Sequence, residues 1–87
     1  MTTVAEFEVA VWNVEGIRII VRERSWAKVD PYNYTNTADK GISVTKYLKT
    51  RVNATIGDYE VVVIGGDGVI VHGNTLLSKV RASYSSE

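Results

Sequence analysis

The clearest candidates for chemistry are cationic side chains interleaved with aromatic rings in the first half of the chain. Such a surface can stack nucleobases on its rings while it grips phosphates, or it can anchor a protein interface. Glu6, Glu8 and Glu23 accompany the cations, and local neutralisation of charge favours the protein interface. The predicted partner-binding residues are Arg18, Ile20, Arg22, Arg24, Trp26, Lys28, Tyr32 and Tyr34.

A second candidate is the glycine-rich segment Gly65-Gly66-Asp67-Gly68. It resembles the Gly-Gly-Asp-Gly phosphate-binding turn of the NAD kinase and diacylglycerol kinase family. The resemblance implies backbone amides that hold nucleotide phosphates where a helix begins. After the motif, however, Val69 stands in place of the usual threonine, and residues 69–71 predict a strand. Glycine and aspartate also supply the positive φ angles of a hairpin turn, so we interpret the segment as a turn.

The remaining reactive side chains form no recognised constellation. His72 is the sole histidine and no cysteine is present, so neither a metal site of known spacing nor thiol catalysis is predicted. No serine lies in a nucleophile-elbow motif, and no two carboxylates present themselves as an acid–base pair. We therefore predict no catalytic residue, no cofactor and no metal site, and we expect the chain not to be an enzyme.

Length and composition predict a single domain over residues 1–87, with a long loop at residues 25–41. Ten basic and ten acidic residues give a formal net charge of +0, which argues against strong non-specific nucleic-acid binding. The N-terminal residues do not follow the pattern of a signal peptide, and no apolar run approaches the ~18 residues that span a membrane. We expect a cytoplasmic location and no membrane partner.

Hydrophobic periodicity predicts the elements that would position these residues. Alternation predicts a first hairpin, with strands at residues 5–12 and 17–24 joined near Gly16. Helical spacing predicts a helix over residues 43–56, with Ser43 as its cap, and a last helix that begins at Asn74. A second hairpin spans residues 59–72. The predicted fold is α+β with the order β-β-α-β-β-α, in which an antiparallel sheet of about four strands carries two helices packed on one face.

The second hairpin is apolar on both faces of both strands, which indicates cover on both sides of the sheet. Two short helices cover one face only. The other face, which includes Ala10, Trp12 and Ile20, is either buried by the loop at residues 25–41 or occupied by a partner. We expect that partner to be a second copy in a homodimer or another protein.

In general build the chain resembles small phage-encoded inhibitor proteins of the anti-CRISPR type, because it is short, single-domain and cysteine-free, with balanced charge and no enzyme motif. The resemblance rests on build alone and assigns no residue. It implies a non-catalytic protein–protein interaction module of viral origin that binds a defence complex in the host cytoplasm and blocks nucleic-acid recognition or cleavage. The alternative is a small nucleic-acid-binding protein that uses the basic and aromatic surface.

Overall fold

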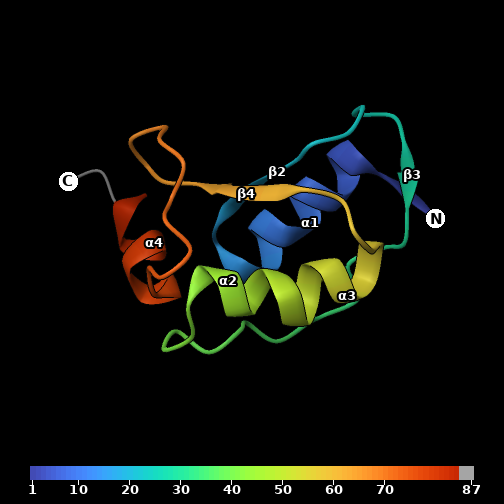
Figure 1. The fold of residues 1–87 in the computed structure, drawn as a ribbon. Helices are drawn as coiled ribbons and strands as arrows, with labels where there is room; N and C mark the ends of the chain where they lie inside the picture. Colours follow the sequence, from blue (N-terminus) through green and yellow to red (C-terminus); the bar gives the residue numbers. More distant parts are fainter. Residues whose placement is uncertain (85–87) are drawn as a thin grey trace.

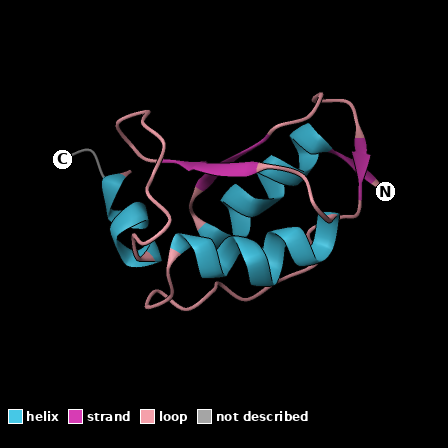
Figure 2. Ribbon diagram, in the orientation of Figure 1, coloured by secondary structure: helices cyan, strands magenta, loops and turns pink. Residues whose placement is uncertain are grey.

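The structure is a computed structural model that describes residues 1–84. It confirms the α+β class, since antiparallel strand pairs and helices combine in one small fold (Figure 2). In chain order the elements are β1 (Thr2–Thr3), α1 (Val4–Glu15), β2 (Arg18–Val21), β3 (Lys28–Val29), α2 (Val44–Tyr47), the π-helical segment η1 (Leu48–Val52), α3 (Asn53–Ile56), β4 (Val61–Ile64) and α4 (Leu77–Ser83).

Helix α1 occupies the residues for which a strand at 5–12 was expected, so that prediction is wrong. A capping box forms its first turn: the Glu6 amide donates to Thr3 Oγ1 at 3.1 Å, and the Thr3 amide donates to Glu6 Oε1 at 2.9 Å. At the other end Gly16 adopts a φ of +71°, a left-handed conformation that glycine takes without strain. Both ends of the helix are thus satisfied by local residues.

The apolar residues of α1 fit two periods at once, which explains the error. Phe7, Val9 and Val11 alternate as they would in a strand, yet Val4, Phe7 and Val11 also recur at helical spacing. The structure buries Val4, Phe7 and Val11 and leaves Val9 exposed. The caps decide between the two periods, because they satisfy amides at the helix start that would otherwise lack partners.

The strands form two separate antiparallel pairs and not the predicted single sheet of about four strands. Strand β2 pairs with β4, so that Ile19 lies opposite Val63 and Val21 lies opposite Val61. The short strands β1 and β3 form the second pair. Because residues 5–12 are helical, β2 takes its partner from a distant part of the chain, and the order of elements departs from β-β-α-β-β-α.

Only the first strand of the predicted hairpin at residues 59–72 is fully formed, as β4. Residues 69–71 return beside its end, where the Val71 amide donates to the Val63 carbonyl at 2.8 Å and the Gly65 amide donates to the Val69 carbonyl at 3.0 Å. These contacts amount to one isolated bridge. The chain does reverse at the glycines as predicted, but a second turn begins at His72 and ends the pairing.

The helix predicted over residues 43–56 is confirmed as the succession α2, η1 and α3. Ser43 Oγ accepts the Lys46 amide at 3.2 Å, and Gly57 follows the last turn with a φ of +88°. Segment η1 is a π-helical insertion, a feature that is often found where a helix must redirect a side chain. The last helix, α4, begins at Leu77, later than the predicted cap at Asn74.

Helices α1 and α2–α3 lie on one side of the β2–β4 pair (Figure 1). The prediction gave this side to the helix at residues 43–56 and the last helix, and it did not include α1. Ile19, Val21 and Val63 are buried on that side and join the same core as the helices. We call the opposite side of the pair the outer face. It is the side on which alternate residues of β2, Arg18 and Ile20, are exposed.

Candidate functional site

The outer face keeps an apolar centre. Ile20 lies opposite Val62 and Arg18 lies opposite Ile64, so four side chains share this side of the ladder. Ile20 is 44% exposed, and Val62 and Ile64 are half-buried. The loop at residues 25–41 does not bury this face. Of the two possibilities that the sequence left open, burial by the loop is therefore the one that the structure does not show.

A groove of about 550 Å³ runs between α1 and β2 and continues the outer face sideways. We call it the α1–β2 groove. Val9 and Trp12 contribute from the helix and are 59% and 39% exposed. The residues that line the groove include Glu8, Val9, Trp12, Arg18, Ile19 and Ile20. The groove therefore joins an apolar helix face to the exposed side of a strand.

Trp12 is held in place at one end of this groove. The Arg18 guanidinium lies 4.9 Å from the centre of the indole ring, and the Tyr84 ring packs edge-on against it at 5.3 Å. The Tyr84 hydroxyl in turn accepts the Arg18 amide at 2.8 Å and donates to the Ile64 carbonyl. A large aromatic side chain that is fixed in this way suits an interface anchor, because little side-chain entropy is lost on binding.

One edge of β2 faces the groove and not β4. The Arg22 amide donates to the Glu60 carbonyl at 2.8 Å, so the amides of Arg22 and Ile20 point toward β4. By alternation, the amides of Ile19 and Val21 point the other way. Glu8 Oε2 accepts the Val21 amide at 2.9 Å, which places a helix carboxylate against this edge.

Six of the eight predicted partner-binding residues are exposed. Arg18 and Ile20 line the groove, and Arg22 continues the strand beyond them. Trp26 is 67% exposed in the turn between β2 and β3, with the Arg24 guanidinium 5.6 Å from its ring centre. The exposed members are Arg18, Ile20, Arg22, Arg24, Trp26 and Lys28.

The two predicted tyrosines lie elsewhere, so the aromatic loop is divided between surface and core. Tyr32 is buried, and its ring packs edge-on against Phe7 at 5.4 Å. Tyr34 is half-buried beneath the Arg51 guanidinium, which lies 4.4 Å from the ring centre. Tyr32 has no surface to offer a partner, because the core draws it in from the loop.

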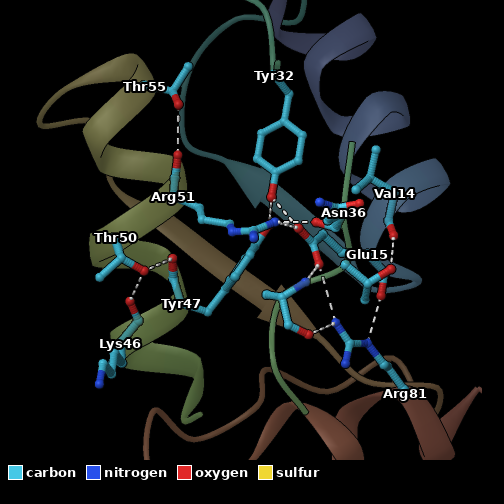
Figure 3. Close-up of polar contacts among 12 residues, drawn as sticks. Val14, Glu15, Tyr32, Asn36, Lys46, Tyr47, Thr50, Arg51, Thr55 and Arg81 are labelled. Carbon is cyan, nitrogen blue, oxygen red and sulfur yellow. Dashed lines mark hydrogen bonds and ion pairs between the residues drawn. The ribbon is translucent and has the colours of Figure 1, made fainter. Parts of the chain in front are cut away.

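The Tyr32 side chain is held in the core by Glu15, a residue that the sequence analysis did not single out. Its side chain is fully buried, and all its contacts come from segments distant in the chain (Figure 3). Oε2 accepts the Tyr32 hydroxyl at 2.5 Å and pairs with Arg51 Nη1 at 2.7 Å. Oε1 accepts the Ala38 amide at 2.7 Å and pairs with Arg81 Nη2 at 3.2 Å.

The Glu15 cluster holds the long loop against the helices. Arg51 also donates to the Asn36 carbonyl at 2.6 Å, and Arg81 donates to the Ala38 carbonyl at 3.1 Å. Both carboxylate oxygens of Glu15 are occupied, so the cluster presents no free acid or base. We interpret it as the support of the loop, with π-helical η1 placing Arg51 toward the carboxylate. The sequence signal was the position of Glu15 on the buried stripe of α1.

Two tyrosines extend this cluster into the core. The hydroxyls of Tyr32 and Tyr47 are 2.9 Å apart, and Tyr32 donates to Glu15. Burial raises the pKa of Tyr32 well above the usual range, and the bond to Glu15 adds to the shift. Burial also raises the pKa of Tyr47, with a further contribution from Tyr32. Both hydroxyls therefore stay neutral at physiological pH and act as fixed hydrogen-bond donors.

The glycine turn serves packing in this structure. The Gly66 amide donates to Ser83 Oγ at 2.9 Å, and a Cβ at Gly66 would lie 1.7 Å from the Ser83 carbonyl oxygen. Asp67 Oδ1 accepts the Val69 amide at 3.1 Å. No helix begins directly after the motif: Val69 lies in a bend, and Ile70 forms a bridge to Ile64. The glycine at position 66 is explained by the close approach of α4.

Other classes of site were sought in the part of the chain that the structure describes. His72 is exposed, and its Nδ1 accepts the Asn74 amide at 3.1 Å. Residues 1–84 contain no group of three or more histidine, aspartate or glutamate side chains arranged to hold a metal ion. None of the described helices has the length and apolar character needed to cross a bilayer. Comparisons with known protein families, curated proteins and solved structures found no match for this chain.

Proposed function

We propose that this chain is a non-catalytic protein-binding module whose contact surface is the outer face together with the α1–β2 groove. The observation that carries the proposal is the shared exposure of Val9, Trp12 and Ile20 around one groove. Small proteins rarely leave large apolar side chains gathered on the surface without a use. An apolar centre with tryptophan and a rim of arginine has the composition of a protein interface.

The energetics indicate what else the interface requires. Full burial of one large aliphatic side chain is worth about 1.5–3 kcal/mol, and Val9 and Ile20 are already half covered. A micromolar complex needs about 8 kcal/mol of binding free energy. Apolar contact at this groove therefore needs support from the arginines at its rim or from backbone hydrogen bonds along β2.

The proposal is tested by capture of protein from a bacterial lysate with the immobilised chain, before and after nuclease treatment. Ile20→Asp should abolish capture while circular dichroism shows an intact fold, because Ile20 is exposed. Leu76→Asp is the matched control, since Leu76 is 43% exposed and outside the groove. Capture that survives Ile20→Asp would exclude the outer face as the contact surface.

The resemblance in build to phage-encoded inhibitors suggests the narrower proposal that the partner is a CRISPR-type defence complex in a host cytoplasm. Purified RNA-guided nuclease complexes of several types, incubated with excess chain, should then include one whose target cleavage falls. The same Ile20→Asp and Leu76→Asp variants identify inhibition that acts through the outer face. If no complex in the panel is inhibited, the inhibitor proposal fails and the binding module remains.

Nucleic-acid binding is the second candidate, and one observation favours it. Trp26 exposes an indole ring with Arg24 beside it, an arrangement that can stack an unpaired base. A single-stranded oligonucleotide should then bind with an affinity that falls steeply with salt, and Trp26→Ala should weaken it. A mainly apolar protein interface would respond weakly to salt.

A further inference from the structure

We propose that the partner enters the α1–β2 groove as an extended acidic segment that adds a strand to the free edge of β2. This inference rests on the proposed function and specifies the chemistry of the partner. Strand addition combines backbone hydrogen bonds, which supply affinity, with side-chain contacts, which supply selectivity. Three features of the groove support it: the hydrogen-bonding groups of the edge, the charges along β2, and the position of Glu8.

The edge of β2 has hydrogen-bonding capacity to offer. Within residues 1–84, neither the amide nor the carbonyl of Ile19 on this edge has a hydrogen-bond partner. Two residues further on, Glu8 Oε2 occupies the place at the Val21 amide that a neighbouring strand's carbonyl would take. Native proteins commonly protect exposed strand edges with charged groups. Glu8 thus covers the edge at Val21, whereas Ile19, which is only 4% exposed as a whole residue, lines the groove with its amide and carbonyl unpaired among the described residues.

Charge along β2 specifies the occupant. Arg18, Ile20 and Arg22 are exposed at alternate positions, so cation, apolar residue and cation follow one another on the outer face. In an added antiparallel strand, directly opposed side chains of opposite charge stabilise the pairing and like charges destabilise it. The complementary segment therefore has acidic residues opposite the two arginines and an apolar residue opposite Ile20.

The same pattern disfavours a second copy of the chain at this edge. The antiparallel self-pairing that includes both arginines and Ile20 is centred on Ile20. It sets Arg18 opposite Arg22 of the second copy at both ends of the pairing. An acidic strand from another protein places carboxylates opposite these arginines, whereas self-pairing places arginine opposite arginine.

Nucleic acid fits the edge less well, although it too is anionic. The Ile19 carbonyl requires an N–H donor, which an extended polypeptide supplies at every second residue and a phosphate backbone does not. An oligonucleotide is therefore the alternative that the experiment must exclude.

The test uses the synthetic peptide Thr-Glu-Thr-Val-Thr-Glu-Thr with blocked ends as the probe, because its two glutamates and the valine between them lie on one face of a strand. Binding to the ¹⁵N-labelled chain is followed by NMR, together with hydrogen exchange of the Ile19 amide. We expect binding with at least about tenfold slower exchange at Ile19, because strand addition engages that amide. The same peptide with N-methyl groups on its threonines should not bind, since those are the amides that face β2 when the glutamates lie opposite the arginines. The corresponding peptide with lysine in place of both glutamates should not bind either.

Variants identify the groups that select the peptide. Arg22→Glu should weaken binding about tenfold, whereas Lys49→Glu, the same change of charge on exposed η1, should leave it unchanged. Glu8→Gln should tighten binding several-fold, because it removes a negative charge that faces the acidic strand. A gain in affinity cannot result from unfolding, so Glu8→Gln keeps the test decisive even if another variant is unstable.

Three results would overturn strand addition: absence of peptide binding, binding without protection of Ile19, and tighter binding of a seven-nucleotide single strand than of the peptide. These results are separable from failure of the proposed function. If Ile20→Asp still abolishes capture of a protein from lysate, the outer face binds protein by another mode. If Ile20→Asp has no effect on capture, the proposed function itself fails.

Discussion

Glu15 is the residue on which the arrangement of the long loop depends. Its carboxylate is fully buried and engages Tyr32, Ala38, Arg51 and Arg81. The two arginine side chains are about one-fifth exposed, so water relieves part of the cost of burying the charges. The value of the cluster lies in specificity of structure: it gives loop residues 32–38 a single place against α1, η1 and α4.

Glu15→Gln should destabilise the fold by roughly 2–4 kcal/mol, because two arginines and a loop amide lose a charged acceptor. Urea denaturation measures the change in the free energy of unfolding. Glu23→Gln, at an exposed position, is the control and should change that free energy by less than about 0.5 kcal/mol. Equal effects of the two substitutions would contradict the role assigned to Glu15.

Tyr32 and Tyr47 predict a loss of stability at alkaline pH. Their folded-state pKa values are raised above the usual 10.0. The same two hydroxyls therefore ionise more readily in the unfolded chain than in the folded one. The stabilisation is complete below about pH 10 and declines as the pH rises further, since only the unfolded chain gains by deprotonation. Urea titrations between pH 8 and pH 11 measure this decline. Tyr47→Phe should make it shallower; an unchanged decline would refute the assignment.

At the scale of elements, helix α1 shows how end signals outweigh an ambiguous period. Thr3 and Glu6 form a capping box and Gly16 ends the helix, all within the local sequence. The alternation at residues 7–11 predicts a strand instead. The caps are encoded in the local sequence and identify the helix.

Val9→Ala distinguishes the helix from the strand by stability alone. In α1 the side chain is exposed, and alanine has the higher helix propensity, so the change should be neutral or stabilise by up to about 0.5 kcal/mol. In the predicted strand Val9 would face the core, and the same truncation would cost about 1–3 kcal/mol. Thermal denaturation followed by circular dichroism measures whether Val9→Ala raises or lowers the stability, and so decides between helix and strand.

Gly66→Ala tests the packing role of the glycine turn. The added Cβ would overlap the Ser83 carbonyl of α4, so we expect a loss of roughly 1–3 kcal/mol. Gly41→Ala is the control, because the nearest atom to its Cβ would be Asp39 Oδ1 at 3.6 Å, an ordinary contact. Urea denaturation measures the free energy of unfolding. If Gly66→Ala leaves it unchanged, the close approach of α4 does not explain the glycine at this position.

At the scale of the whole molecule, helices α1 and α2–α3 lie on one side of the β2–β4 pair (Figure 1), and Arg18 and Ile20 are exposed on the outer face. The loop at residues 25–41 does not cover that face, and its two ends differ in exposure. Its Trp26 end is exposed, whereas its Tyr32 end is fixed at the Glu15 cluster. The molecule therefore presents one apolar groove with arginines along it.

The homodimer predicted from the sequence is tested by light scattering over a concentration series. We expect the mass of one chain, 9.6 kDa, because self-pairing along β2 opposes arginine to arginine. A species of twice that mass, about 19 kDa, that Ile20→Asp dissociates would instead assign the outer face to a homodimer. Leu76→Asp serves again as the control for a change of surface charge.

Local sequence determined the α+β class, the helix over residues 43–56, and the strands at 18–21 and 61–64, because periodicity, caps and turn residues act over a few positions. The exposure of Arg18 and Ile20 also followed from their place in the alternating pattern of the strand. Only the tertiary structure decided which strands pair, that Glu15 is buried, and that Tyr32 leaves the surface. These depend on contacts between residues up to 66 positions apart, such as Glu15 with Arg81, whose free energy no local pattern encodes.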